Sequence, residues 1–428
     1  MFIKKLQIKN FKSIKETNIE FAPLSMIVGA NASGKSNLIN VFRFIGNIVT
    51  DGIDNAIALQ GGIPYLANAN IPKGEPIEIR FVLDMSEENW VRRPKNTNVL
   101  LAVQEIDYKF VIQPHLKGSG YRISEDYLKI SYVYEEKEGA ANSTLTDSGP
   151  VIYSTIFHRK SYKSAIQQTS EITPNIISKE SLKALGPSSD RTATFFCEWA
   201  NEDKEELMLY RISFLLPPCF SENNFIRIFD FDPKELKKAS SMASIKVLSE
   251  DGSNIASVLQ NILRTKENRN KLTTLLKEFL PFIDSISIEN NLDKSFSYKV
   301  KENYSNKAFH ANFLSDGTVS ILAIIIALYF EEKSNIIILE EPERNIHPKL
   351  LSNLLSSAED ISKEKQVIIT THNPEFLKHA KIENVRLVSR NDYGYTNIQV
   401  PETSTTVKCF MENNLGLDDL FLQDMLGE

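Results

Sequence analysis

The chain has very little cysteine and tryptophan, and no long apolar run. Its 428 residues include 3 Cys and 2 Trp. The cysteines, Cys197, Cys219 and Cys409, lie far apart without Cys-x-x-Cys spacing, which argues against a disulfide framework and against a zinc site. No apolar stretch is long enough to cross a membrane as a helix, and no charged-then-apolar leader opens the chain. We therefore expect a cytoplasmic protein with no membrane partner.

The chain also lacks an excess of positive charge. Its formal net charge is −6 and its pI is about 5.7. Proteins that live on DNA usually carry a basic footprint, so nucleic acid is possible as a partner but gains no support here. Local basic groups are best interpreted as solvated faces, although a dimer could gather two of them on one surface. These groups are Lys4, Lys5, Lys9, Lys12, Lys15, Arg92, Arg93, Lys95, 158–160 and Lys163.

The most informative segment present is 29–36, which reads Gly-Ala-Asn-Ala-Ser-Gly-Lys-Ser. It matches G-x-x-x-x-G-K-[ST], the phosphate-binding P-loop. Residues 26–28 read as a buried strand before it, and 37–48 have the apolar spacing of a helix after it. Unpaired N–H groups and the dipole at that helix start favour an anion. Lys35 can reach the β- and γ-phosphates of a nucleotide, and the Ser36 hydroxyl can hold Mg²⁺.

A second candidate site lies at the end of the apolar run 336–339, which Glu340 and Glu341 follow directly. Such a run predicts a buried central strand, and ligands of open α/β sheets lie at the carboxyl ends of strands. Glu340 is placed to hold Mg²⁺, directly or through water, and Glu341 to polarise the attacking water. An ordinary strand that runs into a charged turn would give the same local pattern.

Two more segments resemble ligand-contacting strand and helix ends. Ser315 reads as the N-cap of an apolar helix over 319–330, and with Gly317 it forms a second candidate phosphate site. A simple capped helix is the alternative. The apolar strand 367–371 ends at His372, whose imidazole could contact a γ-phosphate. Taken alone, that histidine is more often a structural residue.

These four segments, in this order, resemble the ABC-type ATPases of the RecF/SMC/OLD branch. In that branch a P-loop, a signature, a Walker B strand and a switch histidine follow one another. The start of the chain, 8–14, reads Ile-Lys-Asn-Phe-Lys-Ser-Ile and is also similar. The resemblance covers roughly 1–85 and 245–390. It implies an α/β fold, an ABC-type P-loop ATPase head with a mixed central sheet flanked by helices and an antiparallel β subdomain.

The resemblance also implies cofactors and roles. ATP and Mg²⁺ would be bound, with Ser36 and Glu340 as the metal residues. Catalysis would rest on Glu341 as the base, His372 as the switch histidine and Lys35. In this family the signature contacts ATP held by the opposite subunit, and the loop 345–348 would cross that dimer interface. The residues implied to bind nucleotide are Gly29, Asn31, Ser33, Gly34, Lys35, Ser36, Asn37, Ser315 and Gly317.

The chain departs from the family pattern at three positions. Walker B strands of the family usually end Asp-Glu, whereas this one has Glu340 in place of the aspartate. The signature has Asp316 in place of a glycine and Thr318 in place of a glutamine. Asp316 would add negative charge near a phosphate unless it points away. The family's glutamine-loop residue has two weak candidates, Gln60 and Gln104.

We divide the chain into an N-terminal ATPase lobe with the antiparallel subdomain (1–135), an insertion expected to be mostly helical or irregular (136–244), and a C-terminal ATPase lobe (245–428). No sustained heptads occur, so a compact insertion replaces the coiled-coil arm of SMC proteins. Asp230-Phe231-Asp232 resembles a metal-binding pair but has no partner acid. The acidic amphipathic tail 415–426 either packs on its own lobe or docks a partner.

The sequence therefore predicts a slow ATPase that works as a homodimer through composite ATP sites, with higher assembly possible. The stretch after His372 is too short for the Toprim nuclease domain of OLD proteins. We expect the sensor ATPase of a bacterial anti-phage, abortive-infection system with a separate nuclease or toxin as effector. The alternative is a RecF-like DNA-binding ATPase of repair, and a third possibility is a regulator that binds ATP without useful turnover.

Overall fold

The structure, a computed structural model, describes residues 1–87, 91–92, 99–136, 145–146, 149–150, 152–160, 166–173, 206–211, 225–242, 247–332, 334–401, 407 and 416–423. The three cysteines and the basic residues Arg93, Lys95 and Lys163 lie outside these ranges. The chain forms two compact units. Unit 1 comprises Met1–Phe21, Ser36–Phe225 and Ser389–Ile398, and unit 2 comprises Ala22–Lys35, Ile226–Val388 and Gln399–Glu428.

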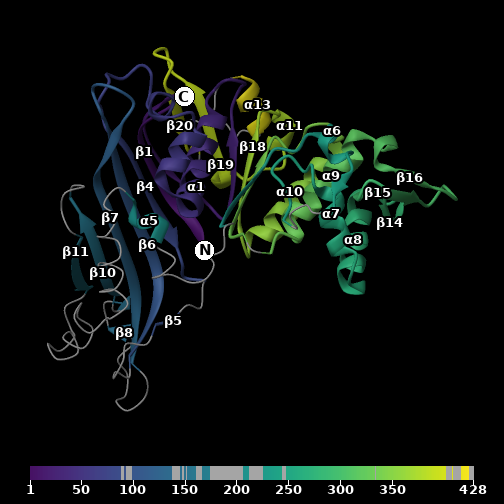
Figure 1. Cartoon of the computed structure of the whole chain (residues 1–428), viewed down its shortest axis with the longest axis horizontal. Coiled ribbons are helices and arrows are strands. Elements are labelled where there is room, and N and C mark those ends of the chain that lie inside the picture. The colour runs from purple at the N-terminus through teal and green to yellow at the C-terminus, as the bar shows by residue number, and fades with distance from the viewer. Residues whose placement is uncertain are drawn as a thin grey trace. The chain divides into compact units, whose positions relative to one another are not determined.

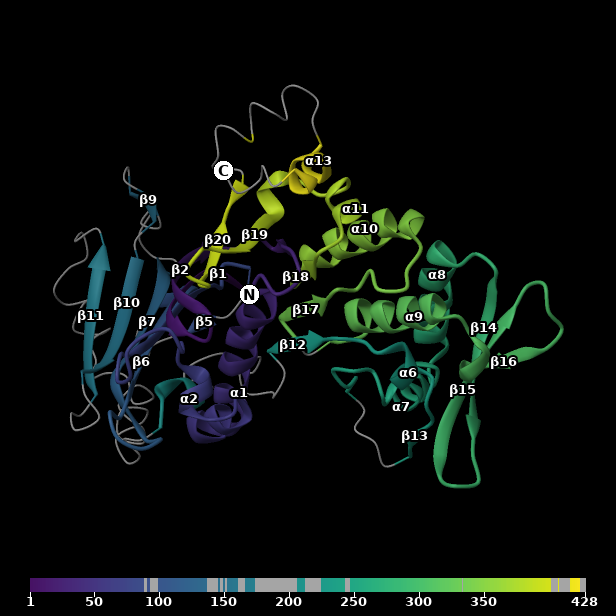
Figure 2. The ribbon, with the colours of Figure 1, turned by 90° about the horizontal axis from the view of Figure 1, so that it is seen from above.

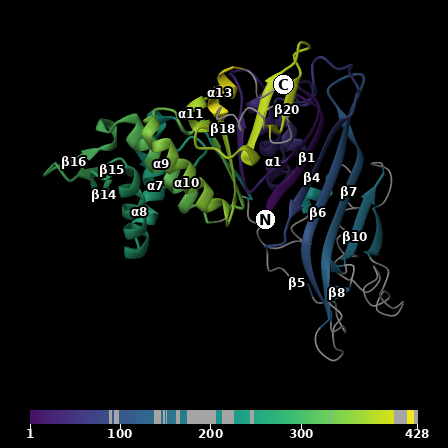
Figure 3. The ribbon, with the colours of Figure 1, turned by 180° about the vertical axis from the view of Figure 1, so that it is seen from behind.

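Unit 1 is built on a large antiparallel sheet with the strand order β11-β10-β7-β6-β4-β1-β2 (Figure 3). Alternating burial explains the strands: in β4, Ile77, Ile79, Phe81 and Leu83 are buried while the residues between them are partly exposed. The strands are β1 (Phe2–Phe11), β2 (Ile14–Glu20), β4 (Ile77–Asp84), β6 (Val99–Pro114), β7 (Tyr121–Glu136), β10 (Ile152–Arg159) and β11 (Gln167–Thr173), with β5 (Val91–Arg92) beside β6. β8 (Leu145–Thr146) and β9 (Gly149–Pro150) pair separately.

Helix α1 (Lys35–Leu59) follows the P-loop and packs on this sheet (Figure 1). Its Phe44 ring lies 5.9 Å from the ring of Phe11 and 6.3 Å from that of Phe110. The helix breaks at Gly52, where φ is 80° and ψ is 170°. Only glycine adopts this backbone readily, so the sequence itself sets the break. A short helix, α2 (Ile63–Leu66), comes next in the chain.

A buried polar network holds the segment 206–211, which includes α5 (Met208–Arg211), against the sheet. The Asp126 carboxylate accepts from Arg159 Nη2 at 2.9 Å, from the Tyr108 hydroxyl at 2.5 Å and from the Met208 backbone N–H at 2.9 Å. Asp126 and Arg159 are both fully buried. Paired charges with filled hydrogen bonds are the form in which ions persist in a protein interior. The network therefore anchors a distant stretch of chain to β6, β7 and β10.

A second sheet has the order β12-β17-β18-β3-β19-β20 (Figure 2). Its strands belong to unit 2, except for the residues of β19 and β20 within 389–398, which are assigned to unit 1. The pairs from β12 to β19 are parallel, and β18 and β3 are buried along their whole length, as in sheets covered on both faces. The strands are β3 (Leu24–Val28), β12 (Ile226–Phe229), β17 (Ile336–Glu340), β18 (Gln366–Thr371), β19 (Val385–Arg390) and β20 (Thr396–Gln399).

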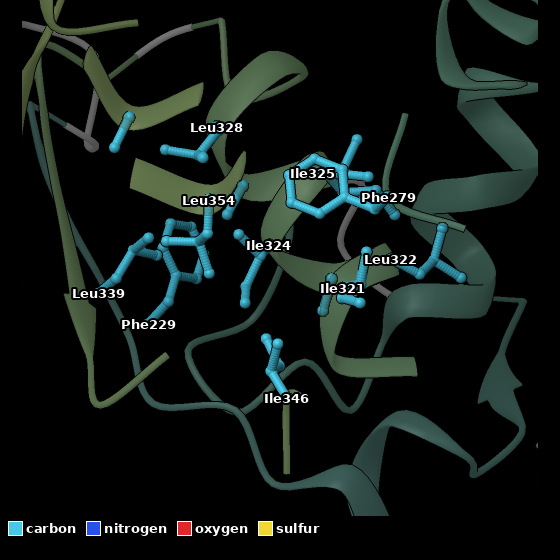
Figure 4. Close-up of a cluster of buried hydrophobic side chains, with 14 of the residues drawn as sticks. Phe229, Phe279, Ile321, Leu322, Ile324, Ile325, Leu328, Leu339, Ile346 and Leu354 are labelled. Carbon is cyan, nitrogen blue, oxygen red and sulfur yellow. The ribbon is translucent and has the colours of Figure 1, made fainter. Parts of the chain in front are cut away.

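Helix α9 (Asp316–Tyr329) is the centre of the unit 2 core. It is apolar all round and buried from Thr318 to Leu328, which is the signature of a core helix. Figure 4 shows Phe229 and Leu339 of the sheet gathered with Ile324 and Leu328 of α9 and Leu354 of α10. The other helices are α6 (Pro233–Leu236), α7 (Ile255–Ile262), α8 (Lys266–Phe279), α10 (Leu351–Ser362) and α11 (Pro374–Leu377), with 3-10 turns at Ala311–Phe313, Pro348–Leu350 and Ile382–Asn384.

A smaller antiparallel sheet and a C-terminal helix complete unit 2. The sheet comprises β13 (Ser240–Ser241), β14 (Ile283–Asn290), β15 (Ser295–Glu302) and β16 (Ala308–His310). The described part of the tail forms α13 (Leu417–Leu422), which packs against α11 and buries Leu417 and Leu420 in the core. Of the two interpretations of the tail, packing on its own lobe therefore holds for these residues.

The expectation of helix and irregular structure for 136–244 is wrong for most of its described residues. These form the strands β8 to β13 as well as α5 and α6. β10 and β11 extend the unit 1 sheet, and β12 joins the central sheet beside β17. Polar residues can occupy such strands because pairing with a neighbouring strand, and not burial of both faces, satisfies their backbone. The boundaries 135 and 244 stay an interpretation of the sequence.

Candidate functional site

The P-loop leaves β3 at Gly29 and ends where α1 begins at Lys35. A Cβ added to Gly29 would lie 2.2 Å from the Val388 carbonyl oxygen, so no larger residue fits there. Ala32 and Gly34 have positive φ angles of 63° and 114°. These turns place the loop in a tight curve ahead of the first N–H groups of α1, which is the geometry that binds phosphate.

Lys35 is folded over this loop. Its Nζ donates to the carbonyl oxygen of Gly29 at 2.7 Å and to that of Ala30 at 3.1 Å. Only 7% of the residue is exposed. Burial lowers the pKa of the ammonium, while the carboxylates of Glu341 and Glu343 oppose that shift. The charge of Lys35 therefore interacts with the charges of the acids that follow β17, within unit 2.

The other predicted loop residues differ in exposure. Asn31 and Ser36 are exposed, whereas Ser33 and Gly34 are buried. In unit 1, Asn37 Nδ2 donates to the hydroxyl oxygen of Ser13 at 2.5 Å. That contact fixes the turn between β1 and β2 beside the start of α1. The Ser36 hydroxyl is accessible, as a Mg²⁺ ligand must be.

Glu341 is the most heavily engaged of the predicted catalytic residues. Its Oε1 lies 3.0 Å from His372 Nδ1, and its Oε2 accepts from Arg344 Nε at 3.0 Å. Its φ is +43°, and its backbone N–H donates to the Thr370 carbonyl oxygen at 3.0 Å. Burial raises the pKa of the Glu341 carboxyl, but the hydrogen bonds from Arg344 and His372 outweigh burial and leave the pKa below its usual value. Glu341 is therefore held as a carboxylate.

The parallel register of β17 and β18 explains this pairing. Glu340 is opposite Thr370, so the residues that follow the two strands meet at the same edge of the sheet. Glu340 ends β17 at that edge and is partly exposed. Glu340, Glu341 and His372 therefore follow or end neighbouring parallel strands at one edge of the sheet.

The sequence pattern did not single out Glu343 as a residue of the site. It is buried, with 7% of its surface exposed, and the Thr371 hydroxyl donates to its Oε1. Burial raises its pKa, against the opposing effect of that hydrogen bond. The available signal was a third acid in the run Glu340-Glu341-Pro342-Glu343 that follows the apolar strand.

The signature segment, Leu314–Thr318, forms the start of α9 as predicted. Ser315 caps the helix, because its Oγ accepts from the Thr318 N–H at 3.1 Å. A Cβ on Gly317 would lie 2.7 Å from the Asn345 carbonyl oxygen, so the loop after β17 abuts this glycine. The added charge of Asp316 is compensated, since its Oδ1 lies 2.6 Å from Lys237 Nζ.

The weaker candidates have other roles. Asp230 accepts from Arg344 Nη1 at 2.9 Å, and Asp232 caps α6 by accepting from the Lys234 N–H at 2.9 Å. Among the residues described, no cluster of His, Cys, Asp and Glu forms a metal site. Gln60 is buried directly after α1, and Gln104 lies in β6 at a break in register, so both belong to unit 1.

The basic group 158–160 is not a continuous surface patch, because one of its members is buried. Arg159 is fully buried in the network with Asp126, so it is removed from any basic face formed with His158 and Lys160. In the ranges that the structure covers, no helix is both long and apolar enough to span a membrane.

The residues of the site fit a nucleoside triphosphate. Gly29 leaves no room for a Cβ, and Gly34 has a positive φ that favours glycine. Lys35 supplies a cation, and Ser36 in the first turn of α1 is exposed. Carboxylate and hydroxyl oxygens of the kind that Glu340 and Ser36 carry are ligands that Mg²⁺ prefers. A base and a histidine, 3.0 Å apart, lie on the same unit as the lysine. This set can bind phosphates and activate a water.

Comparisons with known proteins agree with this chemistry. A family model described as AAA ATPase domain matches residues 1–377. An ATP/GTP phosphatase of Helicobacter pylori (strain ATCC 700392 / 26695) is 22% identical over 394 residues, covering 88% of this chain and 86% of that protein. The chromosome partition protein Smc of Halothermothrix orenii (strain H 168 / OCM 544 / DSM 9562) is 49% identical over 47 residues, 10% of this chain and 4% of that protein.

Among solved structures, an SMC head bound to the C-terminal winged-helix domain of ScpA is similar in fold. The TM-score is 0.50 and the identity is 13%, over 93% of this chain and 97% of that chain. The expected fold, an ABC-type ATPase head like that of SMC proteins, is thereby confirmed. Since the family model covers most of its length, the chain belongs to the AAA ATPase domain family.

Proposed function

We propose that this ATPase is a dimeric switch in which two subunits enclose two ATP molecules and each signature completes the partner's site. The observation that carries the proposal is the exposed start of α9, where Ser315 and Asp316 are open to solvent at the first turn of a 14-residue helix. Its free N–H groups favour an anion from outside the subunit. The adjoining loop residues Arg344 and Asn345 are exposed as well.

In the proposed reaction, Lys35 and the P-loop bind the phosphates, while Ser36 and Glu340 would hold Mg²⁺. The metal ion, when bound, neutralises charge that develops on the transferred phosphoryl group. Glu341 accepts the proton of the attacking water, and His372 fixes the orientation of that carboxylate through its 3.0 Å contact. Because both carboxylate oxygens of Glu341 are already engaged, slow turnover is expected.

The biological role that we propose is that of the sensor ATPase of a bacterial anti-phage, abortive-infection system with a separate nuclease or toxin as effector. The support is the resemblance to stand-alone ATPase subunits of such systems. Exposed apolar side chains also occur on and beside the β14–β16 sheet of unit 2. These are Leu292, Tyr304, Phe309 and Phe313. Leu292 and Tyr304 lie in the turns at the two ends of β15, so these side chains do not form one patch and do not locate a partner site.

Substitution of Glu341 tests the switch. Glu341→Gln should bind ATP without hydrolysing it, so ATP with Mg²⁺ should convert the 48.5 kDa monomer to a stable dimer in light scattering. Lys35→Ala is the matched control and should stay monomeric, because it loses the cation that holds the phosphates. A Glu341→Gln protein that remains monomeric with saturating ATP would refute the composite site.

The role is tested by a pull-down of Glu341→Gln from its native cells, with bound protein and nucleic acid both identified and Lys35→Ala as the parallel sample. A stoichiometric nuclease-like or toxin-like partner, lost in Lys35→Ala, is the expected result. Duplex DNA without a protein partner would overturn the sensor role in favour of a repair clamp. That outcome would be checked by the salt dependence of DNA binding.

A further inference from the structure

One side chain of the loop that follows β17, that of Arg344, bonds both to Glu341 of the same loop and to Asp230, which follows β12. Arg344 donates from Nε to Glu341 Oε2 at 3.0 Å and from Nη1 to Asp230 Oδ1 at 2.9 Å. Asp230 directly follows β12, the strand that pairs with β17. The guanidinium therefore spans the carboxyl ends of two adjacent strands, which a planar group with several fixed donors does well.

This bridge occupies the oxygen that catalysis needs. With His372 on Oε1 and Arg344 on Oε2, Glu341 has a strong hydrogen-bond donor on each carboxylate oxygen. Charge-assisted bonds of this kind are short and strong, so they compete directly with a water that must donate its proton to the same carboxylate. The observed arrangement orients Glu341 but leaves it poorly available as a base.

The same loop also contacts the signature. It starts and ends in left-handed backbone, with φ of +43° at Glu341 and +63° at Asn345. Asparagine adopts this backbone readily, whereas glutamate does so at a cost, so the strain lies at Glu341. The Asn345 carbonyl oxygen lies against Gly317, 2.7 Å from where a Cβ would be. A displacement of the signature would consequently press on the residue next to Arg344.

We propose that Arg344 is a positioning residue that restrains Glu341 in the free subunit and gives up its Oε2 contact when a partner subunit engages the signature. The proposal rests on the proposed dimeric switch. Asp230 is the anchor of the restraint, since it holds the guanidinium from the side opposite to Glu341. Arg344 is well suited to move, because its side chain is 46% exposed and so is not locked by packing.

Three variants test this restraint by steady-state kinetics. Arg344→Gln should raise kcat roughly threefold to tenfold with little change in KM, since the base is released while phosphate binding is untouched. Asp230→Asn should raise kcat by less, because Arg344 stays near Glu341 but loses its anchor. Arg264→Gln, at an exposed arginine of α7's C-terminal flank, is the control and should behave as wild type.

A readout without nucleotide separates restraint from simple damage. In the nucleotide-free protein, amide hydrogen exchange of the loop 341–346 should be several-fold faster in Arg344→Gln than in wild type, at an unchanged melting temperature. The double variant Arg344→Gln with Glu341→Gln should show no gain in turnover, since the effect is transmitted through Glu341.

Unchanged or lower kcat in Arg344→Gln, at a wild-type melting temperature, would overturn the proposal. An unchanged rate of amide hydrogen exchange in the loop 341–346 of Arg344→Gln would overturn it as well. Failure of this kind is distinguishable from failure of the switch itself, because Glu341→Gln would still dimerise with ATP if only the restraint were absent.

Discussion

Single positions in the nucleotide loop admit only one residue type, and Gly29 is the clearest case. The backbone of β19 passes so close that the Val388 carbonyl oxygen occupies the space of a side chain. Lys35 Nζ also bonds to the Gly29 carbonyl at 2.7 Å, so a shift of Gly29 would move the lysine. The loop therefore depends on the distance between two parallel strands as much as on its own sequence.

Replacing Gly29 with alanine tests this dependence. The new Cβ would force the backbone away from Val388, at a cost of about 1–3 kcal/mol in the free energy of unfolding. ATP affinity, measured by calorimetric titration, should fall at least about tenfold, since the loop donors are displaced. Gly120→Ala is the control, because its Cβ would meet only the His115 ring, which can turn away. Wild-type affinity in Gly29→Ala would contradict the close packing.

A pH effect on stability is expected from Glu331. Its burial raises the pKa of the carboxyl above the usual 4.5, although Arg227 and Lys365 oppose this. Because the pKa is higher in the folded state, the group's stabilising contribution is complete below about pH 4.5 and is lost as the pH rises through the folded pKa. Glutamine stays neutral throughout. The melting temperature of Glu331→Gln relative to wild type should therefore increase from about pH 4.5 to about pH 8.

The control for this measurement is Glu332→Gln, at the exposed neighbour of Glu331. It should follow the wild-type melting temperature at every pH. A difference between Glu331→Gln and wild type that is constant with pH would show that the carboxyl titrates alike in the folded and unfolded chain.

At the scale of elements, continuous apolar runs were predictable from the sequence and short or polar strands were not. β17, β18 and α9 are apolar runs bounded by polar residues, and the structure has them where the pattern indicates. β12 is only four residues long and contains Arg227, so its pattern resembles a loop. β10 and β11 are strands because β7 pairs with them, which no local pattern expresses.

The candidate site likewise has residues that were predictable from the sequence and residues that were not. Glu341 and His372 follow apolar strands and meet because those strands are parallel neighbours, which fold type predicts. The contacts of Arg344 and Glu343 depend on the left-handed turn at Glu341 and on the strand β12, and neither was foreseeable from residue spacing. Ser315 could be predicted as a cap because its hydrogen bond is local.

The break in α1 offers a prediction at this scale. The second half of the helix starts at Ile53, whose N–H donates to Glu206 Oε1 at 3.0 Å. Glu206 therefore caps a helix 153 residues earlier in the chain. Glu206→Ala should lower the free energy of unfolding by about 1–2 kcal/mol, the usual effect of a lost cap. Urea denaturation would measure it, with Glu16→Ala, at an exposed position of β2, as the control that should change little.

At the scale of the whole molecule, each compact unit is drawn from three separate stretches of the chain. The P-loop strand β3 belongs to unit 2, while most of the helix that follows belongs to unit 1. Unit 2 alone carries Lys35, Glu341, His372 and the signature. A single subunit therefore contains every predicted active-site role, and the proposed dimer requires that the signature serve the other subunit.

Mixing two inactive variants tests this exchange. Lys35→Ala lacks the phosphate cation but keeps its signature, and Ser315→Arg has an altered signature but keeps its P-loop. Neither variant should form an active dimer alone, but each mixed dimer has one intact composite site out of two, so mixing should restore an ATPase activity that neither component has. If the mixture is as inactive as its components, each site is completed within one subunit.

The position of β3 in its sheet has a consequence for synthesis on the ribosome. β3 (Leu24–Val28) is made early, but its partners are β18 (Gln366–Thr371) and β19 (Val385–Arg390). At about 5–20 residues per second, the nascent P-loop waits roughly 20–70 s for these strands. During that interval the loop has no Val388 to shape it and no Glu341 beside its lysine. A growing chain should therefore acquire nucleotide only after β18 and β19 have been made, and a transcript cut short before β18 would yield a P-loop that cannot bind.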